Sequence, residues 1–111
     1  MNYNDKIFRP VLNSANAETN EDTLFHYRQE GNMLTCEYAG GKIKHGQLLG
    51  IVDDVGQIKM CYQQINDLGE LKTGICTSTP ELLPNGKIRL HEDWQWTCGD
   101  RSSGKSIIEE L

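Results

Sequence analysis

The chain has 111 residues, of which 24% are charged and 37% hydrophobic, and its formal net charge is −5 at pH 7. This length fits one domain over residues 1–111, with a single modest core. An acidic chain without a basic cluster is poorly suited to nucleic acid or anionic membranes, so we expect neither as a partner. No apolar run approaches the roughly 18 residues of a transmembrane helix, and no signal peptide is recognisable. We therefore expect a cytoplasmic protein.

Short turn signals divide the chain into strand-length segments. They combine Gly with Asn, Asp or Pro, which adopt the backbone angles of tight turns. The signals are Gly31-Asn32, Gly40-Gly41, Asp53–Gly56, Asp67–Gly69, Pro84–Gly86 and Cys98–Gly104. The Asn85-Gly86 pair predicts a type I′ turn with Gly86 at positive φ.

Between these turns, apolar and polar residues alternate with the period of two that is typical of strands. The pattern predicts a short strand at 6–8, a polar loop or weak helical turn at 11–22, and seven further strands. Those strands lie at 23–30, 33–38, 42–52, 57–66, 70–79, 87–97 and 105–111. About eight strands and no helix predict an all-β antiparallel up-and-down meander. We expect a small barrel or half-barrel similar in kind to lipocalins and fatty-acid-binding proteins, because closure removes exposed edges.

The cysteines, the histidines and the glycine-rich segments form no recognisable metal or cofactor motif. The four cysteines form no C-x-x-C pair, and in a reducing compartment we expect free thiols that fill the core. The three histidines fall on separate strands without ligand spacing, so we expect no metal. Gly104-Lys105-Ser106 lacks the first glycine and the following helix of a phosphate loop, and we expect no cofactor.

Candidate binding residues follow from assigning each strand an inward face by its larger apolar side chains. Seven polar or aromatic residues then share inward faces with apolar ones: His45, Gln47, Tyr62, Gln64, Thr77, Glu92 and Trp94. Unpaired buried polar groups are costly, so these groups either satisfy one another in an internal network or line a ligand cavity. A register slip of one residue would invert the faces, and this alternative stays open.

Glu92 shares its predicted face with Trp94 and Trp96. A carboxylate beside indoles is partly desolvated, which raises its pKa and suits general acid–base chemistry. The alternative is an ion pair with a basic group, such as Arg89 or, from another strand, Lys42 or Arg28.

Segments along nearly the whole chain resemble a family of small bacterial one-domain proteins that carry the label N-acetylglutamate synthase. The matching segments include Phe8-Arg9-Pro10, Gly40–Ile43, Gly74–Cys76, Ser78–Glu81 and the run from Asn85 to Trp96. The resemblance implies a bacterial setting and an acetyl-CoA-dependent transferase that acts on glutamate. The sequence has no Gln/Arg-x-x-Gly-x-Gly/Ala loop before a helix, the unit that would hold the pyrophosphate of acetyl-CoA, so the resemblance assigns no residue roles.

Besides an acetyltransferase, the sequence supports three functional hypotheses. The leading one is non-covalent binding of a small, partly polar molecule inside the barrel. The second is a small enzyme that uses Glu92 with Tyr62 or His45 as acid and base. The third is a structural or self-association module with a packed polar core, in which a homodimer is an open expectation.

Overall fold

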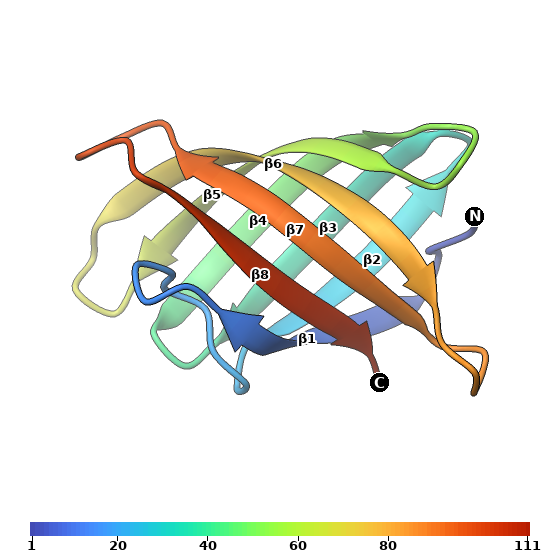
Figure 1. Cartoon of the computed structure of the whole chain (residues 1–111). Coiled ribbons are helices and arrows are strands. Elements are labelled where there is room, and N and C mark those ends of the chain that lie inside the picture. Colours follow the sequence, from blue (N-terminus) through green and yellow to red (C-terminus); the bar gives the residue numbers. More distant parts are fainter.

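The computed structural model describes residues 1–111 as eight antiparallel strands without a helix (Figure 1). The strands are β1 (Lys6–Asn13), β2 (Leu24–Glu30), β3 (Met33–Gly40), β4 (Ile43–Val52), β5 (Ile58–Asn66), β6 (Leu71–Leu82), β7 (Ile88–Trp96) and β8 (Ser103–Glu110). They follow one another around a closed barrel, in which β8 pairs with β1. The predicted all-β antiparallel meander is confirmed, and it forms a full barrel. No helix is present that is long and apolar enough to cross a membrane.

The first strand is longer than predicted. Val11, Leu12 and Asn13 continue β1, although their local sequence favoured a loop. This extension pairs with β8 through a register shift between Pro10 and Leu12. Proline has no ladder donor and is tolerated at such irregularities. The extension exists because it closes the barrel against a strand about 95 residues away, as its Asn13↔Ser106 pairing shows, and local sequence carries no sign of that partner.

The two ends of the barrel are built differently. Both termini lie at the end with the β2–β3, β4–β5 and β6–β7 turns, which we call the terminal end (right in Figure 1). Tyr3 closes this end: its side chain is fully buried, and its hydroxyl donates to the Gly56 carbonyl. Its ring packs against Phe8 and Tyr27. The opposite end, which we call the loop end, carries the β1–β2 loop of residues 14–23.

Alternate residues of every strand point into the barrel and form the core. Towards the terminal end the core is mainly aliphatic, with Leu34, Val52, Ile58, Ile88 and Leu90 all buried. Towards the loop end it is aromatic and contains buried polar side chains as well. The polar half of the interior therefore lies under the β1–β2 loop, and this is where a site could form.

The β6–β7 turn differs in type from the prediction. Gly86 has positive φ (84°), as expected, but Asn85 does not. Leu83 N–H donates to the Lys87 carbonyl, and Gly86 N–H donates to the Leu83 carbonyl. This is a three-residue turn that ends in a glycine bulge, and not a two-residue type I′ turn. Pro84 favours it, because its fixed negative φ suits the first central position of a type I turn.

All four cysteines are free thiols. Cys36 and Cys76 are buried inside the barrel, as predicted for core-filling thiols. Cys61 is exposed on the outer face, and Cys98 is half-buried beside the core at the loop end.

Candidate functional site

The barrel encloses a cavity of about 60 Å³ beneath the β1–β2 loop. Its walls are largely aromatic and include Phe25, Tyr38, Tyr62, Trp94 and Trp96. Residues 17–19 of the loop cover it. This volume holds a few water molecules and is well below the roughly 300 Å³ at which typical ligand pockets begin.

Glycines on neighbouring strands make room for the aromatic walls. Tyr62 on β5 is paired with Gly74 on β6, and a Cβ placed on Gly74 would lie 2.2 Å from the tyrosine ring. Trp94 on β7 is paired with Gly104 on β8, where a Cβ would lie 2.4 Å from the indole. Tyr38 has the same relation to Gly46. The large rings therefore occupy the space over these glycines, which is free because the paired residue has no side chain.

Glu92 supplies a carboxyl group to the cavity. Ser78 Oγ, which is fully buried, donates a hydrogen bond of 2.6 Å to Glu92 Oε2. Burial raises the pKa of Glu92 to about 7, although hydrogen bonds from Ser78 and Cys76 act in the opposite direction. Near neutral pH this carboxyl group can therefore accept or donate a hydrogen bond.

Tyr27 places a second polar group against the same cavity, and its hydroxyl is buried without a hydrogen-bond partner. Its pKa is raised well above the usual value, first by burial and then by the negative charge of Glu92. A buried hydroxyl without a partner costs about 1–3 kcal/mol. The interior thus holds one unsatisfied hydrogen-bonding position close to a carboxyl group that titrates near neutrality.

Two consecutive hydrogen bonds fix Trp94 across the seam where β8 pairs with β1. Its Nε1 donates to Ser106 Oγ at 2.9 Å, and Ser106 Oγ donates to Asn13 Oδ1 at 2.6 Å. These bonds connect β7, β8 and the extended part of β1. The indole wall of the cavity is therefore held rigidly in place.

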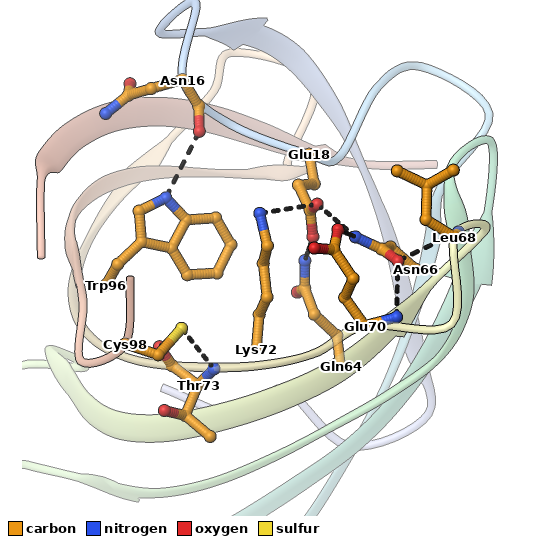
Figure 2. A network of polar contacts seen from close by, with 10 residues as sticks. All are labelled: Asn16, Glu18, Gln64, Asn66, Leu68, Glu70, Lys72, Thr73, Trp96 and Cys98. Carbon is orange, nitrogen blue, oxygen red and sulfur yellow. Dashed lines mark hydrogen bonds and ion pairs between the residues drawn. The ribbon is translucent and has the colours of Figure 1, made fainter. Parts of the chain in front are cut away.

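Glu18 reaches from the β1–β2 loop into the mouth of the barrel (Figure 2). Its carboxylate accepts hydrogen bonds from Gln64 Nε2 and Asn66 Nδ2, each at 2.8 Å, and lies 3.1 Å from Lys72 Nζ. Lys72 also lies over the Trp96 ring. The mouth of the cavity is therefore closed by a polar network that includes a carboxylate of the chain itself.

The structure divides the seven residues predicted for the site. Four of them border the interior cavity: Tyr62, Gln64, Glu92 and Trp94. The other three lie on the outer face: His45 and Gln47 are exposed, and Thr77 is half-buried between Lys59 and Asp93 of neighbouring strands. The expected inward position of His45, Gln47 and Thr77 is thus corrected, and His45 cannot act with Glu92 as an acid–base pair.

The face assignment was wrong for β4 beyond Ile43 and for β6, because a strand irregularity or small inward residues hid the inward face. An irregularity between Ile43 and His45 shifts β4, so that Gly46, Leu48 and Gly50 turn inward. On β6, Gly74, Cys76 and Ser78 are buried, whereas Ile75 points outward. A rule based on the larger apolar side chains fails wherever a small residue makes room for a neighbouring ring.

Sequence reasoning did not single out Glu18, Tyr27 or Tyr38. Period-two alternation on β2 and β3 could have placed the two tyrosines inward, since Phe25 and Cys36 share their faces. Glu18 gave no usable signal, because it lies in a polar loop whose path over the barrel depends on tertiary contacts.

No group of three or more His, Cys, Asp or Glu side chains is placed to hold a metal ion. The histidines are all exposed on the outer face, and His91 contacts Glu81 there. Because the barrel contains no helix, the strand–loop–helix unit that binds acetyl-CoA pyrophosphate has no counterpart in it.

A closed up-and-down barrel with an aromatic-lined interior and a few polar groups is the architecture of small-ligand-binding β-barrels. Within that class, residues 1–111 match the family described as avidin-like protein, and the chain belongs to this family. No curated protein and no solved structure matches the chain.

Proposed function

We propose that this protein binds a small, partly polar molecule inside the barrel, beneath the β1–β2 loop. The observation that carries this proposal is the unpartnered Tyr27 hydroxyl, which borders the same cavity as the Glu92 carboxyl group. A ligand that accepts a hydrogen bond from Tyr27 and donates one to Glu92 would satisfy both groups. Its remaining surface would be flat and apolar, to match the indoles of Trp94 and Trp96.

The size of the cavity limits the ligand. About 60 Å³ admits only a few non-hydrogen atoms while the loop is in place. A larger ligand would insert its polar end towards Glu92 and displace loop residues at the mouth. Avidin-like proteins bind small ligands such as biotin, so biotin is the first compound to test.

Binding can be measured by tryptophan fluorescence, because both indoles of the protein line the cavity. Glu92→Gln keeps the shape and removes the charge, and it should weaken binding about tenfold or more, as expected for a lost charged hydrogen bond. Glu37→Gln, on the exposed face of β3, is the matched control and should bind like the wild type. Native mass spectrometry of protein purified from its own host would reveal a retained ligand. If no ligand is retained and biotin leaves the fluorescence unchanged, the proposal loses its support.

An enzymatic role for Glu92 with Tyr62 is a second candidate, favoured by the pKa of about 7 at Glu92. Mass spectrometry of the ligand recovered from these titrations tests it: chemical conversion of a bound ligand, lost in Glu92→Gln, would establish an enzyme. Recovery of the unaltered ligand would leave binding as the function.

We further propose that the protein self-associates through its outer face. Met33, Leu49, Ile51, Cys61 and Ile75 form what we call the outer apolar patch, over β3 to β6. Met33 pairs with Ile51, and Cys61 pairs with both Leu49 and Ile75, so the patch is continuous. Leu49 and Ile51 are 59% and 62% exposed. A second copy suits it, because a twofold axis through one patch buries the same apolar surface twice.

Light scattering of Leu49→Glu tests this second proposal. The variant should be monomeric at concentrations where the wild type is dimeric. Leu68→Glu is the control, since Leu68 is 80% exposed in the β5–β6 turn, away from the patch. A monomeric wild type at high concentration would exclude self-association through this face.

A further inference from the structure

The contacts of Glu18 resemble those of a bound ligand more than those of a loop residue. Glu18 comes from the β1–β2 loop, yet its side chain is only 14% exposed and all its polar partners belong to the barrel wall. Gln64 and Asn66 lie at the end of β5, and Lys72 lies at the start of β6. In Figure 2, the Lys72 nitrogen and the Asn66 amide flank the Glu18 carboxylate, and the Gln64 amide lies below it.

The barrel positions these donors independently of Glu18. Tyr38 donates to Gln64 Oε1 at 2.8 Å, which turns the amide nitrogen of Gln64 towards the mouth. Asn66 Oδ1 accepts bonds from the backbone N–H groups of Leu68 and Glu70, which turns its amide nitrogen the same way. The orientation of the two amide donors is therefore fixed by the barrel wall.

These donors require an acceptor. Gln64 and Asn66 are 3% and 2% exposed, and a buried donor without a partner costs about 1–3 kcal/mol. Burial by itself raises the pKa of Glu18, but bonds from Asn66, Gln64 and Lys72 outweigh it, so the pKa lies below its ordinary value. The mouth therefore stabilises an ionised carboxylate, whichever molecule carries it.

We propose that Gln64, Asn66 and Lys72 form a carboxylate-binding subsite, which Glu18 fills when no ligand is bound and a ligand carboxylate takes over. The inference rests on the proposed function, since the incoming carboxylate belongs to a molecule that enters the barrel. Release of Glu18 also enlarges the entrance to the cavity. The loop is thus an internal competitor that a carboxylate ligand must displace.

The chemistry of the subsite favours a carboxylate over a phosphate. It contains one cation and two neutral amides, which match the single charge and planar oxygens of a carboxylate. Glu70 Oε1 lies 2.9 Å from Asn66 Nδ2, so a second negative charge at this position would be repelled. A dianion therefore lacks the positive charge that it needs here.

Movement of the loop has a built-in reporter. Trp96 Nε1 donates to the Asn16 carbonyl in the loop at 3.3 Å, and the Trp96 ring lies 5.4 Å from Lys72 Nζ. Release of Glu18 disturbs both contacts, so tryptophan fluorescence reports whether the subsite is occupied and the loop closed.

The experiment removes the internal carboxylate and supplies one from solution. Glu18→Ala is titrated with sodium acetate and followed by fluorescence and melting temperature, with acetamide and sodium chloride as controls at matched concentration. Acetate alone should give a saturable response. In the wild type its apparent affinity should be at least tenfold weaker, because the tethered carboxylate is present at a high effective concentration. Glu21→Ala, an exposed acidic residue of the same loop, should behave like the wild type.

A second variant tests whether the acetate response comes from binding at the subsite. Glu18→Ala combined with Lys72→Met should lose the acetate response, because the cation is removed while a side chain of similar length stays. If Glu18→Ala does not fold, Glu18→Gln replaces it. The glutamine amide can accept hydrogen bonds at only one of the two positions held by the carboxylate oxygens, so this variant should show the same acetate preference. An equal response to acetamide, or a response that persists without Lys72, would overturn the proposal.

The test of the carboxylate subsite and the test of the proposed function can succeed or fail independently. Acetate binding to Glu18→Ala needs no ligand in the interior, so the subsite can be confirmed even if no ligand binds beside Glu92. Conversely, a ligand could bind beside Glu92 with equal affinity in the wild type and in Glu18→Ala. That result would support the proposed function and refute the carboxylate subsite.

Discussion

Ser78 and Glu92 face each other directly across β6 and β7 inside the barrel, and Ser78 Oγ donates to Glu92 Oε2 at 2.6 Å. This bond and the one from Cys76 do not compensate for the loss of water around the carboxylate, and burial raises the pKa of Glu92 to about 7 from an ordinary value of 4.5. The protonation of this interior residue is thus linked to folding, and under the proposed function it would be linked to ligand binding as well.

The free energy of unfolding should fall as the pH rises through the pKa of about 7. Between the ordinary value and this raised value, the folded protein binds more protons than the unfolded chain. The stabilisation is therefore complete below the unfolded pKa and is lost above the folded one. The loss should be on the order of 3 kcal/mol, since each unit of the pKa difference corresponds to about 1.4 kcal/mol, and Glu92→Gln should abolish it. Urea unfolding of both proteins across this pH range measures the difference, and parallel pH profiles would contradict the prediction.

Ligand affinity should also depend on the protonation of Glu92, but it should rise with pH where the free energy of unfolding falls. A ligand N–H donates better to the ionised carboxylate, so affinity should increase as the pH passes through about 7. Fluorescence titrations at several pH values measure this, with Glu92→Gln as a variant without the dependence. An affinity that falls with rising pH would instead indicate that Glu92 donates its proton to the ligand.

Gly74→Ala should destabilise the barrel by about 1–3 kcal/mol, the usual cost of overpacking a core. The new methyl group would meet the Tyr62 ring at 2.2 Å, and the ring would have to move into the cavity. Tyr62→Ala should make the same glycine substitution nearly neutral, which a double-mutant cycle detects. Thr79→Ala, on the exposed part of β6, controls for a general effect on the strand. Additive losses would show that the ring and the glycine are independent.

Gly86→Val should lower the free energy of unfolding by more than about 1 kcal/mol, because Gly86 has φ of 84° and a β-branched residue is strained there. Nothing lies within 4 Å of a Cβ at this position, so the loss is purely conformational. Gly86→Asn is the control, since asparagine tolerates this conformation better and should cost much less. Equal denaturation midpoints for the two variants would refute this explanation.

The thiols should differ sharply in their reactivity towards a thiol reagent. All four cysteines should react in denaturant without reductant, since all are free. In the native protein the exposed Cys61 should react first. Cys36 and Cys76 should stay protected, because burial raises the pKa of each thiol and the barrel excludes the reagent. Two missing thiols in the denatured protein would reveal a disulfide instead.

Local sequence was enough to predict most of the strands, the positions of the turns and the all-β class. Gly56, Gly69 and Gly86 mark turns in which only a residue tolerant of positive φ is comfortable, and this information is local. The inward faces of β5 and β7 could also be predicted, because Ile58, Met60, Ile88 and Leu90 are large and apolar. This assignment correctly placed four residues of the candidate site, Tyr62, Gln64, Glu92 and Trp94, on the inward face.

The remaining features depend on contacts between strands and loops that are distant in the sequence. The inward faces of β4 and β6 depend on rings that belong to neighbouring strands: Gly46 and Gly74 point inward because Tyr38 and Tyr62 need the space. Their own sequences suggested the opposite face, since an irregularity or a small residue leaves no apolar signature. Glu18 lies in the mouth because it binds Gln64, Asn66 and Lys72, which are about 46–54 residues further along the chain. Such pairings depend on barrel closure, which brings distant segments together and which no local pattern encodes.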